Sequence, residues 1–206
     1  MPLLNVKDLR LSYNTDNGVL PAVAGVSFSV EQGQTLGIVG ESGAGKSSLA
    51  LALMRILPRN VAVFTGCMEL EGVDIYKLSD EDYRRQIRWR KISMVFQGAM
   101  DSLNPVMKVV RQVAEPLLLN PGVSRRQADA TARRLLEMVM LSPDVANGYP
   151  HELSGGMKQR VMIAMALACN PNLMIADEPT TALDVTIQAQ ILDLMNRLKE
   201  KTGASI

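Results

Sequence analysis

Nine consecutive residues carry the strongest chemical signal in the sequence. Residues 40–48 read Gly-Glu-Ser-Gly-Ala-Gly-Lys-Ser-Ser and match the pattern G-x-x-x-x-G-K-[ST]. Glycines let such a loop curl so that successive N–H groups point at phosphate oxygens. We therefore predict that the loop binds a nucleoside triphosphate. The expected nucleotide contacts are Gly40, Ser42, Gly43, Ala44, Gly45, Lys46, Ser47 and Ser48.

The residues on either side supply the setting that such a loop needs. The apolar run 36–39 predicts a strand before it, and residues 49–57 favour a helix after it. That helix directs its positive N-terminal end at the same anion. We expect Lys46 to reach the β- and γ-phosphates and the Ser47 hydroxyl to hold Mg²⁺. A glycine-rich turn that contains Gly-Lys-Ser by chance is the alternative, and the flanking elements argue against it.

Two carboxylates follow a second apolar run. Asp177 and Glu178 come directly after residues 173–176, which are typical of a buried parallel strand. Ligands bind beyond the carboxyl ends of such strands, so we expect both side chains at the edge where the phosphate loop lies. Successive residues of a strand point in opposite directions, which predicts different roles. Asp177 suits the Mg²⁺ shell and Glu178 suits the activation of water, whereas the alternative is a plain Asp-Glu-Pro turn.

A second helix start attracts anions. Ser154 is a good N-cap, and Gly155 and Gly156 leave the N-terminus of the predicted helix uncovered. Because Lys46 already lies at a helix N-terminus of its own, this second one suggests that two copies of the chain share a nucleotide. The alternative is an ordinary capped helix whose glycines allow close packing.

Hydrophobic periodicity and turn residues predict the remaining elements. A capping box at Ser124-Arg-Arg-Gln127 starts one helix of the block 106–141, which we expect to be interrupted at Pro116 and Pro121. Tyr13 ends the first strand, where it either stacks on an adenine ring or fills the core. The expected strands are 3–13, 22–31, 61–71, 91–96 and 173–176, and the expected last helix is 186–201.

Composition excludes some classes of protein. The net charge is +1, so no global basic field favours a nucleic-acid partner. Cys67 and Cys169 lie far apart in apolar surroundings and suit a reducing compartment. The longest apolar run, 161–169, is far too short to cross a bilayer. If the protein works at a membrane, we expect other chains to supply the spanning helices.

Taken together in chain order, these motifs resemble those of ATP-binding cassette (ABC) ATPases. The resemblance covers essentially the whole chain: Walker A at 40–48, the Q-loop at Gln97, the signature at 153–160, Walker B at 173–178 and the D-loop at 182–184. Finer features resemble the peptide/nickel (oligopeptide/dipeptide) importer subfamily, namely residues 101–105, 149–153 and 180–188.

The resemblance implies an α/β fold of the P-loop NTPase (RecA-like) type. Its core has a mainly parallel sheet, an N-terminal antiparallel β subdomain and an inserted α-helical subdomain. We expect a single ABC ATPase domain over 1–206, with the ATP-binding core in 1–97 and 155–206 and the helical signature subdomain in 98–154. The implied cofactors are ATP and Mg²⁺.

The resemblance also implies roles for single residues. Gln97 would sense the γ-phosphate and Mg²⁺, Glu178 resembles the general base, and Tyr13 resembles the aromatic residue that stacks on adenine. Asp184 would cross the interface between two copies, where Ser154 and the glycines after it close on the ATP of the partner. The implied catalytic residues are Glu178, Gln97 and Lys46, and the implied metal ligands are Ser47, Gln97 and Asp177.

The partners implied by the resemblance are a second ABC ATPase subunit, identical or related, and transmembrane permease subunits that dock in the groove beside the Q-loop. A substrate-binding protein would act indirectly. The chain would then lie at the cytoplasmic face of the plasma (inner) membrane as a peripheral subunit of a peptide or nickel importer. A soluble ABC ATPase of DNA repair or translation, and an ATP-gated clamp without turnover, are the rival interpretations.

One departure from the family pattern matters. The family has a switch histidine in a strand after the last helix, where this chain ends at Ile206, and the single histidine, His151, lies before the signature instead. The cysteine-rich C-terminal tail of the peptide-importer subfamily is also missing. We therefore expect a C-terminally truncated chain that lacks an interior strand of its sheet, binds MgATP and hydrolyses it poorly.

Overall fold

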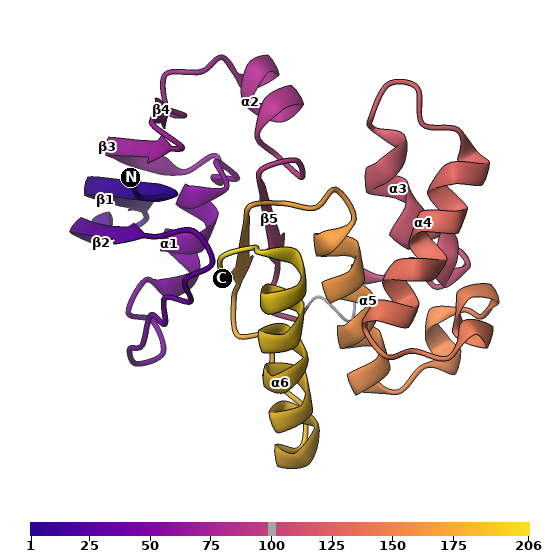
Figure 1. Ribbon diagram of the computed structural model, residues 1–206. Coiled ribbons are helices and arrows are strands. Elements are labelled where there is room, and N and C mark those ends of the chain that lie inside the picture. Colours follow the sequence, from indigo (N-terminus) through magenta and orange to yellow (C-terminus); the bar gives the residue numbers. More distant parts are fainter. Residues whose placement is uncertain (99–101) are drawn as a thin grey trace. The chain divides into compact units, whose positions relative to one another are not determined.

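The computed structural model describes residues 1–98 and 102–206 and forms two compact units (Figure 1). The first unit comprises residues 1–88 with 205–206, and the second comprises residues 89–204. These two units are defined by how densely residues contact one another, and they do not test the predicted boundaries of the helical signature subdomain, which stay a prediction. Asp101, which belongs to the motif 101–105, lies outside the described residues.

The first unit is built on an antiparallel sheet of four strands in the order β2-β1-β3-β4. The strands in sequence order are β1 Leu4–Thr15, β2 Gly18–Val30, β3 Val61–Leu70 and β4 Val73–Asp74. The predicted β subdomain is thus present, but β1 and β2 extend further than expected. Thr15 pairs with Gly18, so the turn between the two strands contains two residues. Leu4, Leu9, Leu11, Met68 and Leu70 line the buried core of this unit.

Helix α1 (Lys46–Leu53) packs against β1 and β2. Its C-terminus is closed by a Schellman motif, in which the N–H of Arg55 donates to Ala52 O and the N–H of Ile56 donates to Leu51 O, both at 3.0 Å. Arg55 occupies the position that usually holds glycine, with φ at 50°. A residue with a side chain is strained in this conformation, so other contacts must hold Arg55 in place.

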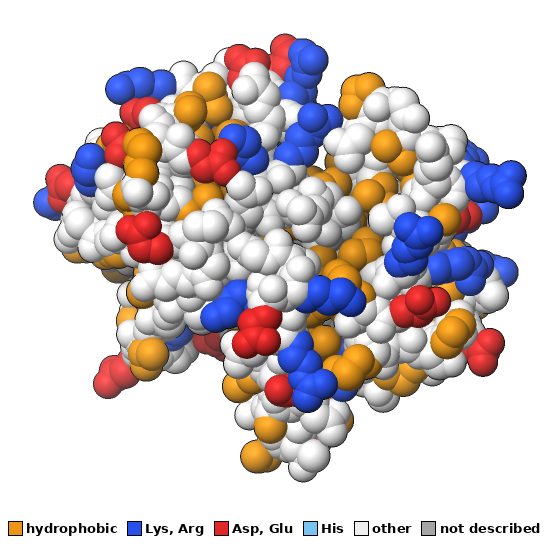
Figure 2. Space-filling view, in the orientation of Figure 1, with side chains coloured by type: hydrophobic (Ala, Val, Ile, Leu, Met, Phe, Trp, Pro, Cys, Tyr) orange, Lys and Arg blue, Asp and Glu red, His pale blue; other side chains and the backbone are white. Residues whose placement is uncertain are grey.

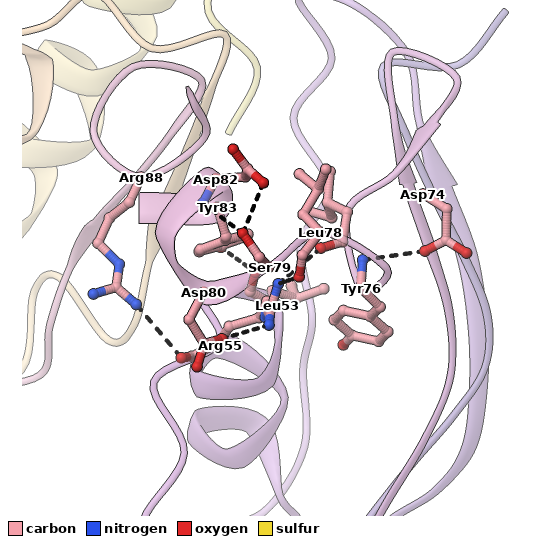
Figure 3. Close-up of polar contacts among 11 residues, drawn as sticks. Leu53, Arg55, Asp74, Tyr76, Leu78, Ser79, Asp80, Asp82, Tyr83 and Arg88 are labelled. Carbon is pink, nitrogen blue, oxygen red and sulfur yellow. Dashed lines mark hydrogen bonds and ion pairs between the residues drawn. The ribbon is translucent and has the colours of Figure 1, made fainter. Parts of the chain in front are cut away.

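Those contacts come from the segment that ends in α2 (Asp80–Gln86), as Figure 3 shows. Arg55 Nη1 donates to the carbonyls of Ile75 and Leu78, both at 3.0 Å, and Arg55 Cζ lies 4.8 Å from the centre of the Tyr83 ring. The Tyr83 hydroxyl donates to Leu53 O at 3.2 Å, and burial raises the pKa of this phenol to about 12. The end of α1 is therefore fixed by side chains from outside the helix.

The predicted strand 36–39 is not formed. The N–H of Leu36 donates to Ile206 O at 2.8 Å, and the N–H of Ile206 donates to Gln34 O at 3.0 Å. Beyond Leu36, no described residue pairs with the segment as a strand, and 47% of Ile38 and 96% of Val39 is exposed. An apolar run forms a buried strand only where neighbours complete the ladder on its two edges.

The second unit contains the two parallel strands that the sequence predicts, β5 (Ile92–Val95) and β6 (Leu173–Ala176). Ile92 pairs with Leu173 and Val95 with Ala176, so the two strands end level with each other. Helix α5 (Gly155–Leu167) packs against β5, against α6 (Val185–Thr202) and against the helical pair α3 (Val109–Leu118) and α4 (Arg125–Met138) (Figure 1). Short 3₁₀ helices at Pro143–Asn147 and Pro150–Glu152 connect α4 to α5.

The predicted capping box is confirmed, and two other helix ends follow the same local chemistry. The capping box of Ser124 and Gln127 starts α4, Ser79 caps α2, and Gly203 ends α6 with φ at 72°. We expected Pro116 to interrupt the helical block, but it lies inside the last turn of α3. A proline in the last turn lacks the N–H that would donate to the carbonyl four residues earlier, and its ring is buried here.

Candidate functional site

The phosphate loop of the first unit has the backbone that its glycines predict. Gly45 caps α1 with φ at 89°, and Gly43 has φ at 82°. A Cβ atom on Gly45 would lie 2.1 Å from the carbonyl oxygen of Ala22 in β2, whereas one on Gly43 would meet nothing within 4 Å. Glycine at 45 is therefore required by packing as well as by backbone conformation.

Lys46 and the start of α1 form a positively polarised site. Lys46 Nζ donates to the carbonyls of Gly40 and Glu41, both at 2.9 Å, so the ammonium group is held over the loop. The first turn of α1, which carries Ser47 and Ser48, contains no acidic residue, and the N-cap residue, Gly45, makes no side-chain capping bond. The N–H groups there can bind an anion, with the Lys46 charge beside them.

A cavity of about 450 Å³ lies beside the loop in the same unit. Its walls come from β2, from residues 36–39 and from the start of α1, and they are mainly apolar. Tyr13 lies at the end of β1, half-buried, opposite Leu20 of β2 and Val61 of β3. The phosphate loop and the candidate adenine-stacking residue thus belong to one unit, while the stacking role of Tyr13 stays a prediction.

The second unit brings three predicted residues to the carboxyl ends of β5 and β6. Asp177 and Glu178 follow β6 directly, and Gln97 lies two residues after β5. Asp177 is buried, and its N–H donates to Val95 O at 3.0 Å. Gln97 Nε2 donates to Glu178 Oε2 at 3.0 Å. The level ends of the two parallel strands account for this contact.

Two residues near Glu178 were missed by the sequence reasoning. Thr181 Oγ1 donates to the same Glu178 oxygen, Oε2, at 2.9 Å. Gln188 Nε2, from the first turn of α6, donates to the carbonyls of Thr180 at 3.3 Å and Leu183 at 3.0 Å. The spacing of Thr181 from Glu178, three residues across a turn that begins at Pro179, was the available signal.

The signature residues start α5 as predicted. Ser154 Oγ accepts from the N–H of Met157 at 3.4 Å, and Asp184 caps α6 by accepting from the N–H of Ile187 at 3.0 Å. A Cβ atom on Gly156 would lie 2.8 Å from Ile187 Cγ2, so Gly156 allows α5 and α6 to pack closely. The packing role of this glycine is therefore present, and a role for Ser154 and Gly155 toward a partner's nucleotide stays a prediction.

The predicted site residues thus form two sets. Lys46, Ser47 and Tyr13 lie in the first unit, and Gln97 and the carboxylate pair lie in the second.

On the face seen in Figure 2, acidic and basic side chains are interspersed, in keeping with the net charge of +1. Among the described residues, no group of three or more His, Cys, Asp or Glu side chains is placed to hold a metal ion. Within residues 1–98 and 102–206, no helix is both long and apolar enough to cross a membrane.

Comparison with known proteins gives consistent matches. Residues 23–181 match the ABC transporter family. The oligopeptide transport ATP-binding protein OppD of Bacillus subtilis is 50% identical over 99% of this chain and 58% of its own length. OppD of Escherichia coli is 49% identical over 99% of this chain and 60% of its own length. The chain therefore spans about three fifths of these curated relatives.

The solved structures agree on the fold. The dimeric post-hydrolysis state of the ATP-binding cassette MJ0796, bound to ADP and Pi, superposes with a TM-score of 0.84 at 30% identity. The match covers 98% of this chain and 85% of that chain. This likeness confirms the fold class predicted from the sequence.

Proposed function

Because the chain belongs to the ABC transporter family, we propose that it is the ATP-binding and ATP-hydrolysing part of an importer subunit. The observation that carries the proposal is the phosphate loop, where Gly45 closes against Ala22 and Lys46 lies over the start of α1. The pairing of Gln97 with Glu178 supports it from the second unit.

In the proposed mechanism, the chain positions a phosphoryl group and provides charge. The N–H groups at the start of α1 and the Lys46 ammonium bind the β- and γ-phosphates. The Glu178 carboxylate accepts a proton from the water that attacks the γ-phosphorus, and the bond from that phosphorus to the bridging β–γ oxygen breaks. Tyr13 stacks on the adenine ring in this proposal.

Magnesium fits the chemistry of the donors. Ser47, Asp177 and Gln97 would offer a hydroxyl, a carboxylate and an amide oxygen, and Mg²⁺ prefers oxygen ligands. Gln97 uses its amide nitrogen for Glu178, so its amide oxygen is the atom suited to the metal. When bound, Mg²⁺ neutralises charge on the phosphate oxygens.

We further propose that two copies, or this chain and a related cassette, close on the nucleotide through Ser154, Gly155, Gly156 and Asp184. The dimeric state of MJ0796 supports this arrangement. Permease subunits would dock beside Gln97, with a peptide-binding protein acting indirectly, at the cytoplasmic face of the inner membrane. The names of the OppD relatives favour peptides as cargo over the DNA-repair and translation alternatives.

Single-turnover hydrolysis of MgATP, together with sedimentation, tests the proposal. We expect Glu178→Gln to bind ATP as the wild type does, to lose turnover, and to accumulate as an ATP-bound dimer. Lys46→Ala should bind ATP weakly and stay monomeric. Unchanged turnover in Glu178→Gln, or ATP-dependent dimers in Lys46→Ala, would contradict the proposed function.

A further inference from the structure

We propose that Thr181 is a positioning residue that orients the Glu178 carboxylate for proton transfer, and that Glu178 Oε1 is the oxygen that accepts the proton. This inference rests on the proposed function, because it assumes that Glu178 is the general base. It adds a residue and an atom that the motifs do not assign.

The hydrogen bonds at Glu178 are unequal between its two oxygens. Thr181 Oγ1 donates to Oε2 at 2.9 Å, and Gln97 Nε2 donates to the same oxygen at 3.0 Å. Two donors on one oxygen fix the rotation of the carboxylate plane, and hydrogen bonds to a carboxylate are stronger than those between neutral groups. Neither of these bonds uses Oε1, so we assign the contact with the attacking water to that oxygen.

The loop that carries Thr181 is itself held in place. The N–H of Thr181 donates to Glu178 O at 3.1 Å, and the N–H of Leu183 donates to Thr180 O at 3.3 Å. Gln188 secures the same loop by donating to the carbonyls of Thr180 and Leu183. The hydroxyl of Thr181 is therefore presented by a braced turn, which is what orientation of a neighbouring side chain requires.

Backbone strain in this loop points in the same direction. Glu178 has φ at 47° and Ala182 has φ at 66°, although neither is a glycine. Such conformations persist only where the surroundings hold them, and they cluster at functional sites. The hydrogen bond from Thr181 holds the Glu178 side chain, and those from Gln188 hold the carbonyls of the residues that flank Thr181 and Ala182.

A purely structural role predicts a different behaviour from a positioning role. Valine at 181 has the shape of threonine and keeps the backbone bond to Glu178 O, so Thr181→Val removes only the hydroxyl. If the hydroxyl merely stabilises the turn, its loss lowers the stability of the chain whatever residue stands at 178. If it orients the carboxylate, its loss lowers the rate only while a carboxylate is present at 178.

The experiment is a double-mutant cycle measured by single-turnover ATP hydrolysis on the full chain. We expect Thr181→Val to lower the rate about tenfold, the effect of losing one hydrogen bond to a charged group, while ATP affinity stays within about twofold. Thr181→Ser should restore the rate. In the Glu178→Gln background, the same valine substitution should change the residual rate by less than about twofold.

Controls separate the possible failures. Thr186→Val changes an exposed threonine in the first turn of α6 and should leave the rate unchanged, and Thr181→Ala serves in the cycle if the valine variant does not fold. An equal loss in both backgrounds, or a parallel loss of ATP affinity, overturns the positioning role and leaves the proposed function intact. A Glu178→Gln variant with full turnover overturns the proposed function and this inference with it.

Discussion

Alanine substitution at two glycines of the phosphate loop separates backbone strain from packing. Gly43 and Gly45 have nearly the same φ, at 82° and 89°, so alanine is strained to a similar extent at both. Their surroundings differ, because a Cβ atom on Gly45 would lie 2.1 Å from Ala22 O and one on Gly43 would lie in open space. Gly43→Ala is thus a matched control for Gly45→Ala.

The expected magnitudes follow from these two terms. Strain for an L-residue in the left-handed region costs roughly 1–2 kcal/mol, which we expect for Gly43→Ala. The Gly45 variant must in addition move the loop or β2 by about 1 Å, because Cβ–oxygen contacts under 3.0 Å are essentially never found. Overpacking of this kind costs roughly 1–3 kcal/mol, so Gly45→Ala should lose about 2–5 kcal/mol in total.

Urea unfolding of the two variants measures this difference, and titration with a fluorescent ATP analogue measures its consequence for binding. We expect Gly45→Ala to be less stable than Gly43→Ala by about 1–3 kcal/mol. The displacement of the loop should also weaken nucleotide binding more in the Gly45 variant. Equal unfolding free energies for the two variants would mean that Ala22 O does not confine the loop.

Two further predictions concern the end of α1 (Figure 3). Because Arg55 has φ at 50°, the unfolding free energy of Arg55→Gly should exceed that of Arg55→Ala by about 1 kcal/mol, the reverse of their order inside a helix. Urea unfolding measures the difference, and the opposite order would contradict the Schellman assignment. Burial raises the pKa of Tyr83 to about 12, above its unfolded value near 10, so its contribution to stability is complete below pH 10 and is lost as the pH rises from about 10 through 12. Tyr83→Phe should flatten this part of the curve of unfolding free energy against pH, and an unchanged slope would exclude Tyr83 as its source.

Features set by neighbouring residues were predictable from the sequence. Ser124 and Gln127 each accept a hydrogen bond from the other's backbone N–H across one helical turn. Glycine adopts the left-handed conformation of Gly203 more easily than other residues do, so both helix ends follow from local chemistry. The resemblance identified Gln97 and Glu178 separately, and their contact agrees with the shared edge of parallel strands. The phosphate loop was predictable because its motif fixes both residue types and spacing.

Other features depend on contacts between distant segments. Residues 36–39 have the composition of a strand, but a strand also needs partners, and the pairing found there involves Ile206. Arg55 in a position suited to glycine is stable only because of contacts with residues 75–83. The contacts of Thr181 and Gln188 could not be predicted for a similar reason, since the role of a polar residue near a motif depends on which atoms it contacts in the fold.

The proposed function requires that the loop before Lys46 binds ATP. Equilibrium titration of MgATP against the wild type, Lys46→Ala and the surface control Lys77→Ala measures this binding. We predict that Lys46→Ala weakens binding about tenfold or more, because the lost contact is one between two charged groups, and that Lys77→Ala binds as the wild type does. An ATP affinity that is unchanged by the loss of Lys46 would contradict the account.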